Sequence, residues 1–595
     1  MPFQISPGIN ISERDLTHVV PNVATSIGAM AGSFQWGPVL ERITVTTENE
    51  LVKKFGKPDN STFKSFFTAA NYLAYSNNLI IVRNVAAAAR NAAVGDIDNG
   101  TSVLVKNRDN YDSTTYTDQL FIAKYPGVLG NSLKAIAIDS IGWAAAVAAG
   151  NSATADQALF LRSFNGTPGT SQDVLAANGG SGTYNDEIHI LVIDSGGQWT
   201  GIVGDVLEAH AYVSMAEGAK KIDGSSNYVK DVLSNESDYV WLGVVEKLTE
   251  NSDDTSPLRN AGSPKVGAGF KRFTKTSAAY YPGGILGGNA ASLGVDANDL
   301  SAGEYNAGYN LYSNADVVDI TLVMQGGATS VTGKYIIDTL ASTGTRMDCV
   351  AFVSPNIGTV VAAGSDSSVI ATNVVADKSA MGSSNYAVMD SAWKYQYDQY
   401  NDVFRYVPMN ADIAGLCART DFTNDAWWSP AGMTRGQIKN IIKLSWDASK
   451  ADRDTLYSGG ANPFHAMTGT GVMLWGDKTM QVVPSAFDRI NVRRLFIVME
   501  KAISIAAKGM LFEFNDEFTR AQFVNMVAPF LREIQGRRGI TDFKVVCDGT
   551  NNTGQVIDTN NFVGDIYVKP NRSINYIQLN FIAARSDVSF TEIGA

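Results

Sequence analysis

The sequence has little of the residue types that most often carry catalysis or bind metals. Its 595 residues include only three cysteines and four histidines. Cys349, Cys417 and Cys547 are far apart, and no Cys-x-x-Cys pair or Cys/His spacing typical of a zinc site is present. We therefore expect reduced, buried cysteines and no metal or cofactor site. Four histidines also leave little material for general-base catalysis.

Long apolar segments and an excess of positive charge are also missing. The first residues, MPFQISPGINISERD, contain no apolar signal core, and the longest alanine-rich stretch, Gly142–Gly150, is too short to cross a bilayer. The net charge is −12, which argues against a nucleic-acid binder. These absences predict a protein that is made and kept in the cytosol and binds neither membrane nor nucleic acid.

Two glycine-containing motifs suggest enzymes but lack essential parts. IDSGG, Ile193–Gly197, is similar to the serine-nucleophile segment of trypsin-like peptidases, but the glycine expected before the aspartate is missing and the upstream histidines have no recognisable setting. PGGILGG, Pro282–Gly288, has no Lys-Ser/Thr and is a weak phosphate-binding candidate. We interpret both as turns or loops and expect no catalytic residue. A hydrolase that uses Asp194 and Ser195 is the competing class.

Length and apolar pattern predict several domains of mixed type. The chain is well above the roughly 250–300 residues at which a single core stops growing. Asp316–Gln325, a helix around Gly333–Thr343 and Met347–Pro355 form a strand–helix–strand pattern, which is typical of a parallel sheet. We predict a multidomain α/β and α+β fold in which inserted outer domains interrupt a discontinuous α/β core.

Changes in composition set the expected domain boundaries. Gly, Ser, Thr, Asn and Asp become frequent after about residue 90, which indicates an inserted β-rich segment, and a mixed pattern follows from about residue 205. Gly204–Gly218 is predicted to be a helix, and Gly283–Asn314 a mobile surface connection. The predicted units are an N-terminal linking arm (1–22), a core (23–95 with 346–510), two inserted outer domains (96–204, β-rich, and 205–345, α/β) and an inner C-terminal domain with a terminal linking strand (511–595).

Two amphipathic helices are predicted near the end of the chain. Ser485 and Asp488 have capping-box spacing ahead of the first helix. Asn515 is the expected N-cap of the second helix, which Pro529 should bend. Each helix carries one apolar stripe, formed by Leu495, Val498, Met499, Ala502, Ile503 and Ala506 in the first and by Phe523, Val527, Phe530, Leu531 and Ile534 in the second.

Both ends of the chain alternate apolar and polar residues but have no nearby strand to pair with. Such a segment pairs with a distant part of its own chain or with another molecule. We therefore predict that both ends are strands that link subunits. Their apolar residues are Phe3, Ile5, Ile9, Ile11, Ile577, Leu579, Phe581 and Ala583.

An ordered set of stretches runs through the chain. In the rear they are SSNYAVMDSAWKYQYDQYNDVFRYVPMNADIAGLCARTD (Ser383–Asp421), WWSPAGMTRGQIKNIIKLSW (Trp427–Trp446), GVMLWGDKTM (Gly471–Met480), SAFDRINVRR and FNDEFTRAQF; in the front they are SPGINISERD, QWGPVLERI, FGKP and AKYPGVLGNSL. Together they cover a little over half of the chain, and residues 140 to 345 add little recognisable pattern. This set resembles the contractile tail sheath protein of T-even-type myoviruses, which are bacteriophages.

The resemblance implies a structural virion protein that polymerises, as rings stacked on a baseplate, into a helical sheath around the tail tube. The sheath shortens and widens to drive the tube through the host envelope, while the terminal strands join sheets of neighbouring subunits. The implied partners are further copies, the tail tube protein, the baseplate and the tail terminator or neck proteins. The implied location is the virion tail, after assembly in the host cytoplasm. A self-assembling shell or surface-layer protein is the alternative, which electron microscopy would show as flat lattices.

Three arginines crowd the end of the second helix. Arg532, Arg537 and Arg538 lie in a nearly neutral part of the chain, since residues 401–595 carry a net charge of +1 and residues 1–400 a net charge of −13. Compensation of the helix dipole and an ionic contact with a partner would both explain them. Because the resemblance makes this end the innermost part of the sheath, we hypothesise that these arginines face acidic groups on the tube protein.

Overall fold

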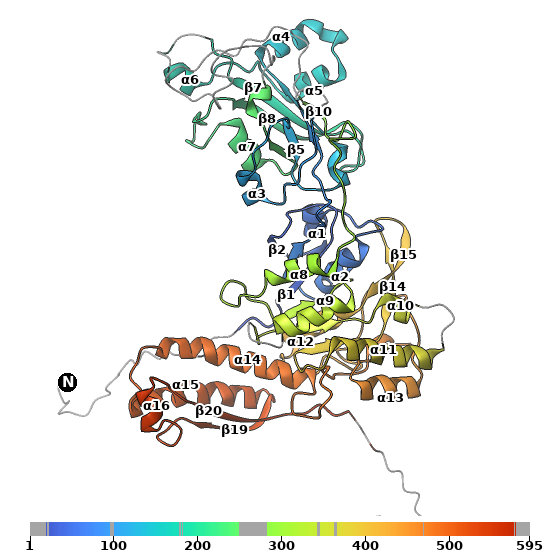
Figure 1. The fold of residues 1–595 in the computed structure, drawn as a ribbon, viewed down its shortest axis with the longest axis vertical. Helices are drawn as coiled ribbons and strands as arrows, with labels where there is room; N and C mark the ends of the chain where they lie inside the picture. The colour runs from blue at the N-terminus through green and yellow to red at the C-terminus, as the bar shows by residue number, and fades with distance from the viewer. Residues whose placement is uncertain are drawn as a thin grey trace, which may run out of the picture.

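In the computed structural model, the chain forms three tiers along its longest axis (Figure 1). The structure describes residues 20, 23–95, 100–177, 180, 183–248, 283–341, 346–361, 366–467, 469–575 and 578. The middle tier is the core, the tier at the top of Figure 1 is an outer domain, and the tier at the bottom contains the last long helices.

The core is built on a six-stranded sheet in the order β13-β12-β11-β1-β3-β2. Distant parts of the chain meet in it, because β1 pairs in parallel with β11, with Gly28 opposite Leu322, and on its other edge with β3. The predicted strand–helix–strand unit is confirmed, since β11 and β12 are parallel neighbours. The strands are β1 (Gly28–Gly32), β2 (Arg42–Val45), β3 (Leu79–Arg83), β11 (Leu322–Met324), β12 (Val350–Val353) and β13 (Ala387–Met389).

Helices and small sheets surround the core sheet, and its inner strands β1, β11 and β12 are entirely buried. Glycine at position 28 is required by close packing, because a Cβ atom there would lie 2.6 Å from the ring of Tyr72 on α2. The helices are α1 (Glu48–Phe55), α2 (Phe63–Leu73), α8 (Ala302–Asn310), α9 (Ser330–Tyr335) with the π-helical turn η4 (Ile336–Ala341), α10 (Ile357–Val360), α11 (Ser367–Met381), α12 (Asn410–Thr423) and α13 (Lys450–Gly459); the small sheets contain β14 (Trp393–Asp398), β15 (Val403–Pro408), β16 (Lys443–Leu444), β17 (Phe464–Met467) and β18 (Gly471–Leu474).

The prediction of a mobile connection over Gly283–Asn314 is wrong. Its second half contains α8, which begins with a capping box at Ser301 and packs against β1. Tyr309, within α8, and Tyr312, just after it, are fully buried. The Tyr309 hydroxyl donates to Met324 O (2.6 Å), and the Tyr312 hydroxyl donates to carbonyls of β1 and β3. Residues 301–341, which were expected in the second outer domain, therefore belong to the core.

The two predicted outer insertions form one domain. The boundary expected at residue 204 cuts between β7 and β8, which are antiparallel partners, and β5 of the first segment pairs with β9 of the second. The helix predicted at Gly204–Gly218 is instead strand β8, because pairing with β7 along its length overrides local helix preference. The sheets are β4 (Ala93–Val94), β5 (Phe121–Ala123) and β9 (Val240–Leu242), and β10 (Gly283–Ile285), β6 (Leu133–Ile138), β7 (Glu187–Asp194) and β8 (Asp205–Ser214).

Helices make this domain mixed in type, although a β-rich segment was expected. They cover its sheets at the top of Figure 1, and a shared apolar cluster joins the two segments, with members from Ala92 to Leu286 and also Trp36 of the core. The helices are α3 (Arg108–Ser113), α4 (Ser140–Ala149), α5 (Ala155–Ser163), α6 (Gln172–Ala177) and α7 (Val229–Glu236), with short 3-10 turns at Val128–Ser132, Gly150–Ser152 and Val245–Leu248.

The chain enters and leaves the outer domain through a single neck. The two linkers pair with each other: Arg90 N donates to Val295 O (3.1 Å) and Val295 N donates to Arg90 O (2.9 Å). Arg83, at the end of β3, is fully buried beside this neck, and burial lowers its pKa to about 9, which leaves it charged at neutral pH. Its guanidinium donates to the carbonyls of Phe34, Gln35 and Gly37 in the core and to Pro126 O (2.6 Å) in the outer domain.

The last tier pairs two long helices with a hairpin. α14 (Ile490–Ala507) and α15 (Glu517–Gly536) lie side by side, and the hairpin of β19 (Ile540–Val546) and β20 (Asp565–Pro570) lies below α15 in Figure 1, with α16 (Gly554–Asp558) between the strands in sequence. Neither predicted cap holds: α14 begins after Arg489 without a side-chain cap, and Asp516, not Asn515, accepts a hydrogen bond from Thr519 N at the start of α15.

We predict that Arg83→Met lowers the free energy of unfolding by about 3 kcal/mol or more, because four buried carbonyls lose their donor. Urea denaturation of the full chain measures this loss. The matched control is Arg42→Met, because Arg42 is exposed and donates only one hydrogen bond, to Leu311 O (3.3 Å); its effect should stay within about 0.5 kcal/mol. Equal effects of the two substitutions would contradict the role assigned to Arg83.

Candidate assembly site in the C-terminal tier

The apolar stripes predicted for the last two helices are confirmed. Leu495, Met499 and Ala502 of α14 share one buried cluster with Phe523, Val527, Leu531 and Ile534 of α15. The expected boundary at residue 510 therefore separates two helices that pack on each other. The hairpin completes this unit, since Phe543, Val545, Ile566 and Val568 pack against the same cluster from one face of β19 and β20. Its other face is largely exposed.

The β19–β20 sheet has two open edges among the described residues. Its strands pair only with each other, from Ile540 opposite Pro570 to Val546 opposite Asp565. A two-stranded sheet is marginally stable by itself, and unpaired strand edges offer main-chain donors and acceptors to an incoming strand. The geometry of this sheet thus permits strand addition on either side.

The segment that leads to the N-terminal arm packs against this tier. Val20 is buried in the α14–α15 cluster, to which Trp427 also belongs. Arg494 of α14 donates to Thr25 O (3.2 Å) and forms a buried ion pair with Asp421 (2.6 Å). The predicted arm residues Phe3, Ile5, Ile9 and Ile11 lie outside the described residues.

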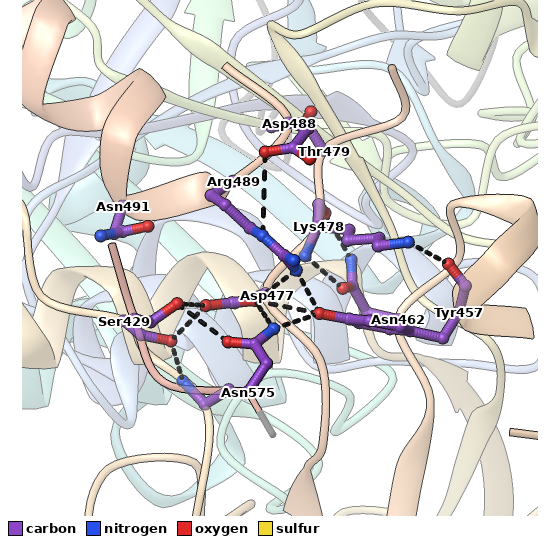
Figure 2. Close-up of polar contacts among 12 residues, drawn as sticks. Ser429, Tyr457, Asn462, Asp477, Lys478, Thr479, Asp488, Arg489, Asn491 and Asn575 are labelled. Atoms are coloured by element: carbon purple, nitrogen blue, oxygen red, sulfur yellow. Dashed lines mark hydrogen bonds and ion pairs between the residues drawn. The ribbon is translucent and has the colours of Figure 1, made fainter. Parts of the chain in front are cut away.

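The segment that leads to the C-terminal strand is held by Asp477, which is 3% exposed. Ser573 Oγ donates to Asp477 Oδ2 (2.6 Å), and Asn575 Nδ2 donates to Asp477 Oδ1 (3.2 Å). Figure 2 shows Asn575 directed at this carboxylate. The predicted strand residues Ile577, Leu579, Phe581 and Ala583 follow immediately and also lie outside the described residues.

The same carboxylate also accepts hydrogen bonds and an ion pair from residues of the core side (Figure 2). Ser429 Oγ donates to Asp477 Oδ2 (3.1 Å), the Tyr457 hydroxyl donates to Oδ1 (3.3 Å), and Arg489 Nη1 forms an ion pair with Oδ1 (3.2 Å). Asp477 thus joins α13, the start of α14 and the last described segment. Asp477 could not be recognised in the sequence, because a single aspartate in a loop carries no distinctive signal.

Buried amide contacts fix the loop that carries Asp477. Asn462 is fully buried; its Nδ2 donates to Lys478 O (2.8 Å), and its Oδ1 accepts from Lys478 N (2.8 Å). The Lys478 ammonium donates to Tyr457 O (2.8 Å). Asn462 thus holds both the N–H and the C=O of Lys478, the residue after Asp477, and this keeps the carboxylate directed toward Ser573 and Asn575.

The three arginines predicted to face the tube have different surroundings. Arg537 forms an ion pair with Asp425 and another with Glu533 (3.5 Å). Burial raises the pKa of the Asp425 carboxyl, and Arg537 opposes that rise. Arg538 has a left-handed backbone (φ 65°) and lies over the ring of Trp428 (5.7 Å). Arg532 is exposed on α15.

The IDSGG motif forms a turn at the end of β7. Asp194 is fully buried, and its carboxylate accepts hydrogen bonds from Ser132 Oγ (2.6 Å) and from the backbone amides of Gln198, Trp199 and Thr200. Burial alone would raise the pKa of Asp194, but these hydrogen bonds outweigh burial and lower it. The carboxylate is therefore already occupied in holding the turn. Within PGGILGG, the residues Gly283–Ile285 form strand β10, which pairs with β6.

Within the described ranges, no group of three or more His, Cys, Asp or Glu residues is placed to hold a metal ion. Over the same ranges, no helix is both long enough and apolar enough to span a bilayer.

Comparison with known proteins identifies the family. Residues 25–83 match the model described as "Tail sheath protein Gp18 domain III N-terminal region", residues 337–480 match the phage tail sheath protein central domain, and residues 482–584 match the phage tail sheath C-terminal domain. The tail sheath protein of Vibrio phage KVP40 is 35% identical, over 99% of both chains. The chain belongs to the phage tail sheath protein family.

Other sheath proteins are similar over most of this one. The tail sheath protein of Enterobacteria phage T4 is 33% identical, over 99% of each chain. The crystal structure of the sheath tail protein from Listeria innocua is 9% identical with a TM-score of 0.49, and the match covers 92% of this chain and 96% of that chain. Family membership rests on the sequence relatives, and it identifies a structural protein of the contractile phage tail.

We predict that Asp477→Asn releases the segment 571–575 from the core of this sheath protein. An asparagine would lose the ion pair with Arg489 and would direct an NH₂ group at neighbouring donors. Amide exchange of 571–575 should rise about tenfold or more, measured by hydrogen–deuterium exchange of the free subunit.

The control is Asp542→Asn, which removes a carboxylate of the same tier from an exposed ion pair with Lys569 (3.3 Å). It should leave exchange of 571–575 unchanged. Unaltered protection in the Asp477 variant would show that the hydrogen bonds to Asp477 do not hold this segment.

Proposed function

We propose that this chain polymerises, as rings stacked on a baseplate, into a helical sheath that surrounds the tail tube and contracts to drive the tube through the host envelope. Its partners are further copies of itself, the tail tube protein, the baseplate and the tail terminator or neck proteins. Assembly takes place in the host cytoplasm before the sheath becomes part of the virion. Membership of the sheath family and a C-terminal tier suited to strand exchange support this proposal.

The observation that carries the proposal is the β19–β20 sheet with its two open edges. One face packs against α15, and neither edge has a partner within the described ranges. The two terminal segments alternate apolar and polar residues, so a strand from either end can turn its apolar side toward the α15 face. Val20 and Asn575, which lie near the two ends of the described chain, both contact residues in or beside this tier, so linkage to neighbouring copies would start from there.

Linkage through strands suits a polymer that changes shape. Added strands are held by main-chain hydrogen bonds, which persist while the bodies of the subunits rotate about the linkers. The extended sheath is then a metastable state behind a barrier, and the baseplate releases it. In this mechanism the energy of contraction comes from packing between subunits.

We predict that deletion of residues 1–12, or of all residues after Asn575, leaves a folded subunit that no longer forms tubes. Both deleted segments alternate apolar and polar residues as strands do. Electron microscopy detects the tubes, and circular dichroism measures folding. Tubes of normal length from both truncated proteins would refute linkage by strands, and loss of folding would assign the strands to the subunit's own sheets.

Arg532 is the best of the three arginines for a contact with the tube, because it is exposed while Arg537 is paired within the chain. Arg532→Glu should weaken assembly on purified tubes, most strongly at low salt, without a change in the melting temperature of the free subunit. Arg537→Glu should instead lower that melting temperature, because it replaces the ion pair with Asp425 by a repulsion. Unchanged assembly of the Arg532 variant at low salt would mean that this arginine only compensates the helix dipole.

A further inference from the structure

An exposed apolar knob joins α14 to α15. It consists of Leu511, Phe512, Phe514 and Phe518, hereafter the phenylalanine knob. Phe512 is fully exposed, and Phe514 and Phe518 are 83% and 77% exposed. Single exposed apolar residues are common, but a contiguous group of this kind marks an interaction site.

The phenylalanine knob is held in place by its own turn. Asn515 Nδ2 donates to Asn561 O (2.8 Å), and Arg520 Nε donates to Asn515 Oδ1 (3.0 Å). Phe512 has a left-handed backbone (φ 73°), which is costly for a residue with a Cβ atom. A turn pinned in this way loses little conformational entropy when the rings are buried against a partner.

A large cleft lies at the opposite end of the same tier. Its volume is about 800 Å³, and it is lined by Trp427, Trp428 and Trp475, hereafter the tryptophan cleft. Trp475 is 40% exposed. Aromatic walls around a concave surface of this size suit large apolar side chains, which are the usual anchors of protein interfaces.

The knob and the cleft carry opposite charge. Residues 511–518, LFEFNDEF, contain three acidic residues and no basic one. Five basic residues line the cleft against two acidic ones, and one of the acidic residues, Asp477, is neutralised by Arg489. The basic residues are Arg435, Lys450, Arg453, Arg538 and Arg572. Complementary charge guides association and fixes which surfaces meet.

One subunit cannot fill its own cleft. The knob lies where α14 turns into α15, and Arg538 of the cleft lies just beyond the other end of α15. A helix of this length spans about 30 Å. A contact between the two surfaces therefore joins different copies head to tail, and such a contact generates helices or rings.

We propose that the phenylalanine knob of one copy inserts into the tryptophan cleft of the next copy in the polymer. This contact rests on the proposed function. Three phenyl rings bury on the order of 450 Å², which is less than the roughly 800 Å² per partner of a stable interface. The contact is therefore too small to form dimers in dilute solution and acts together with the terminal strands.

The experiment is cross-linking of assembled tubes that carry Phe512→Cys together with Asp454→Cys. Both residues are exposed, Asp454 lines the cleft, and the three natural cysteines are buried. A short bis-maleimide should link copies into a ladder that extends beyond dimers. Each single-cysteine variant should give no ladder.

The possible outcomes distinguish a failure of the knob–cleft contact from a failure of the chain to polymerise. Tubes that form but give no ladder overturn the knob–cleft contact and leave the proposed function intact. Cross-linked dimers from Phe512→Cys alone overturn it as well, because knobs would then meet each other. A ladder only in the double variant supports it. Failure of the unsubstituted chain to form tubes under any condition contradicts the proposed function, and the contact with it.

Charge reversal gives an independent measurement. Glu513→Lys with Glu517→Lys should slow assembly about tenfold at low salt, and so should Lys450→Glu with Arg572→Glu, because all four residues are exposed and set the charge of the two surfaces. The four substitutions combined in one chain should restore the rate. If the combined variant assembles no faster than either pair, the two surfaces do not meet.

Discussion

The fold depends on one constraint, the parallel pairing of β1 with β11. This pairing brings Gly28 beside Leu322 and places the β11–β12–β13 half of the sheet next to the N-terminal half. The entropy cost of closing a long connection rises only slowly with its length, so a complete domain fits between the two strands. The connection has one requirement, which is that its two ends lie close together at the core sheet. The paired linkers at Arg90 and Val295 and the buried Tyr309 and Tyr312 meet this condition.

Sequence patterns predicted the elements whose contacts are regular. The apolar runs around β11 and β12, and the stripes of α14 and α15, depend on burial that repeats with the period of the element, so they could be recognised. β8 was missed because its pairing with β7 comes from a distant segment and overrides the local preference. Tyr309, within α8, and Tyr312, just after it, were missed because a Gly- and Asn-rich context hid their spacing of three residues, although two aromatic residues in a polar segment were a usable signal.

The candidate site was predictable only in part. The alternating termini and the amphipathic helices pointed to assembly through the end of the chain, but Asp477 could not be found, since its importance arises from five donors that come together only in the fold. The arginines illustrate the same limit. Sequence placed Arg537 and Arg538 at a helix end, whereas their actual partners, Asp425 and Trp428, lie more than a hundred residues earlier.

The neck also has an evolutionary consequence. The outer domain is continuous in space, builds its apolar cluster around one residue of the core, Trp36, and is joined to the core by two adjacent linkers. A genetic exchange with crossovers near residues 90 and 295 would therefore replace the whole outer domain and leave the core sheet and the C-terminal tier unchanged. The incoming segment would have to supply the contacts that the outer domain makes with the core. Pro126 O accepts from Arg83, Lys106 O accepts from Val39 N, and Tyr125 and Trp199 pack against Trp36. The outer domain can thus diverge in sequence independently of the core sheet and the C-terminal tier.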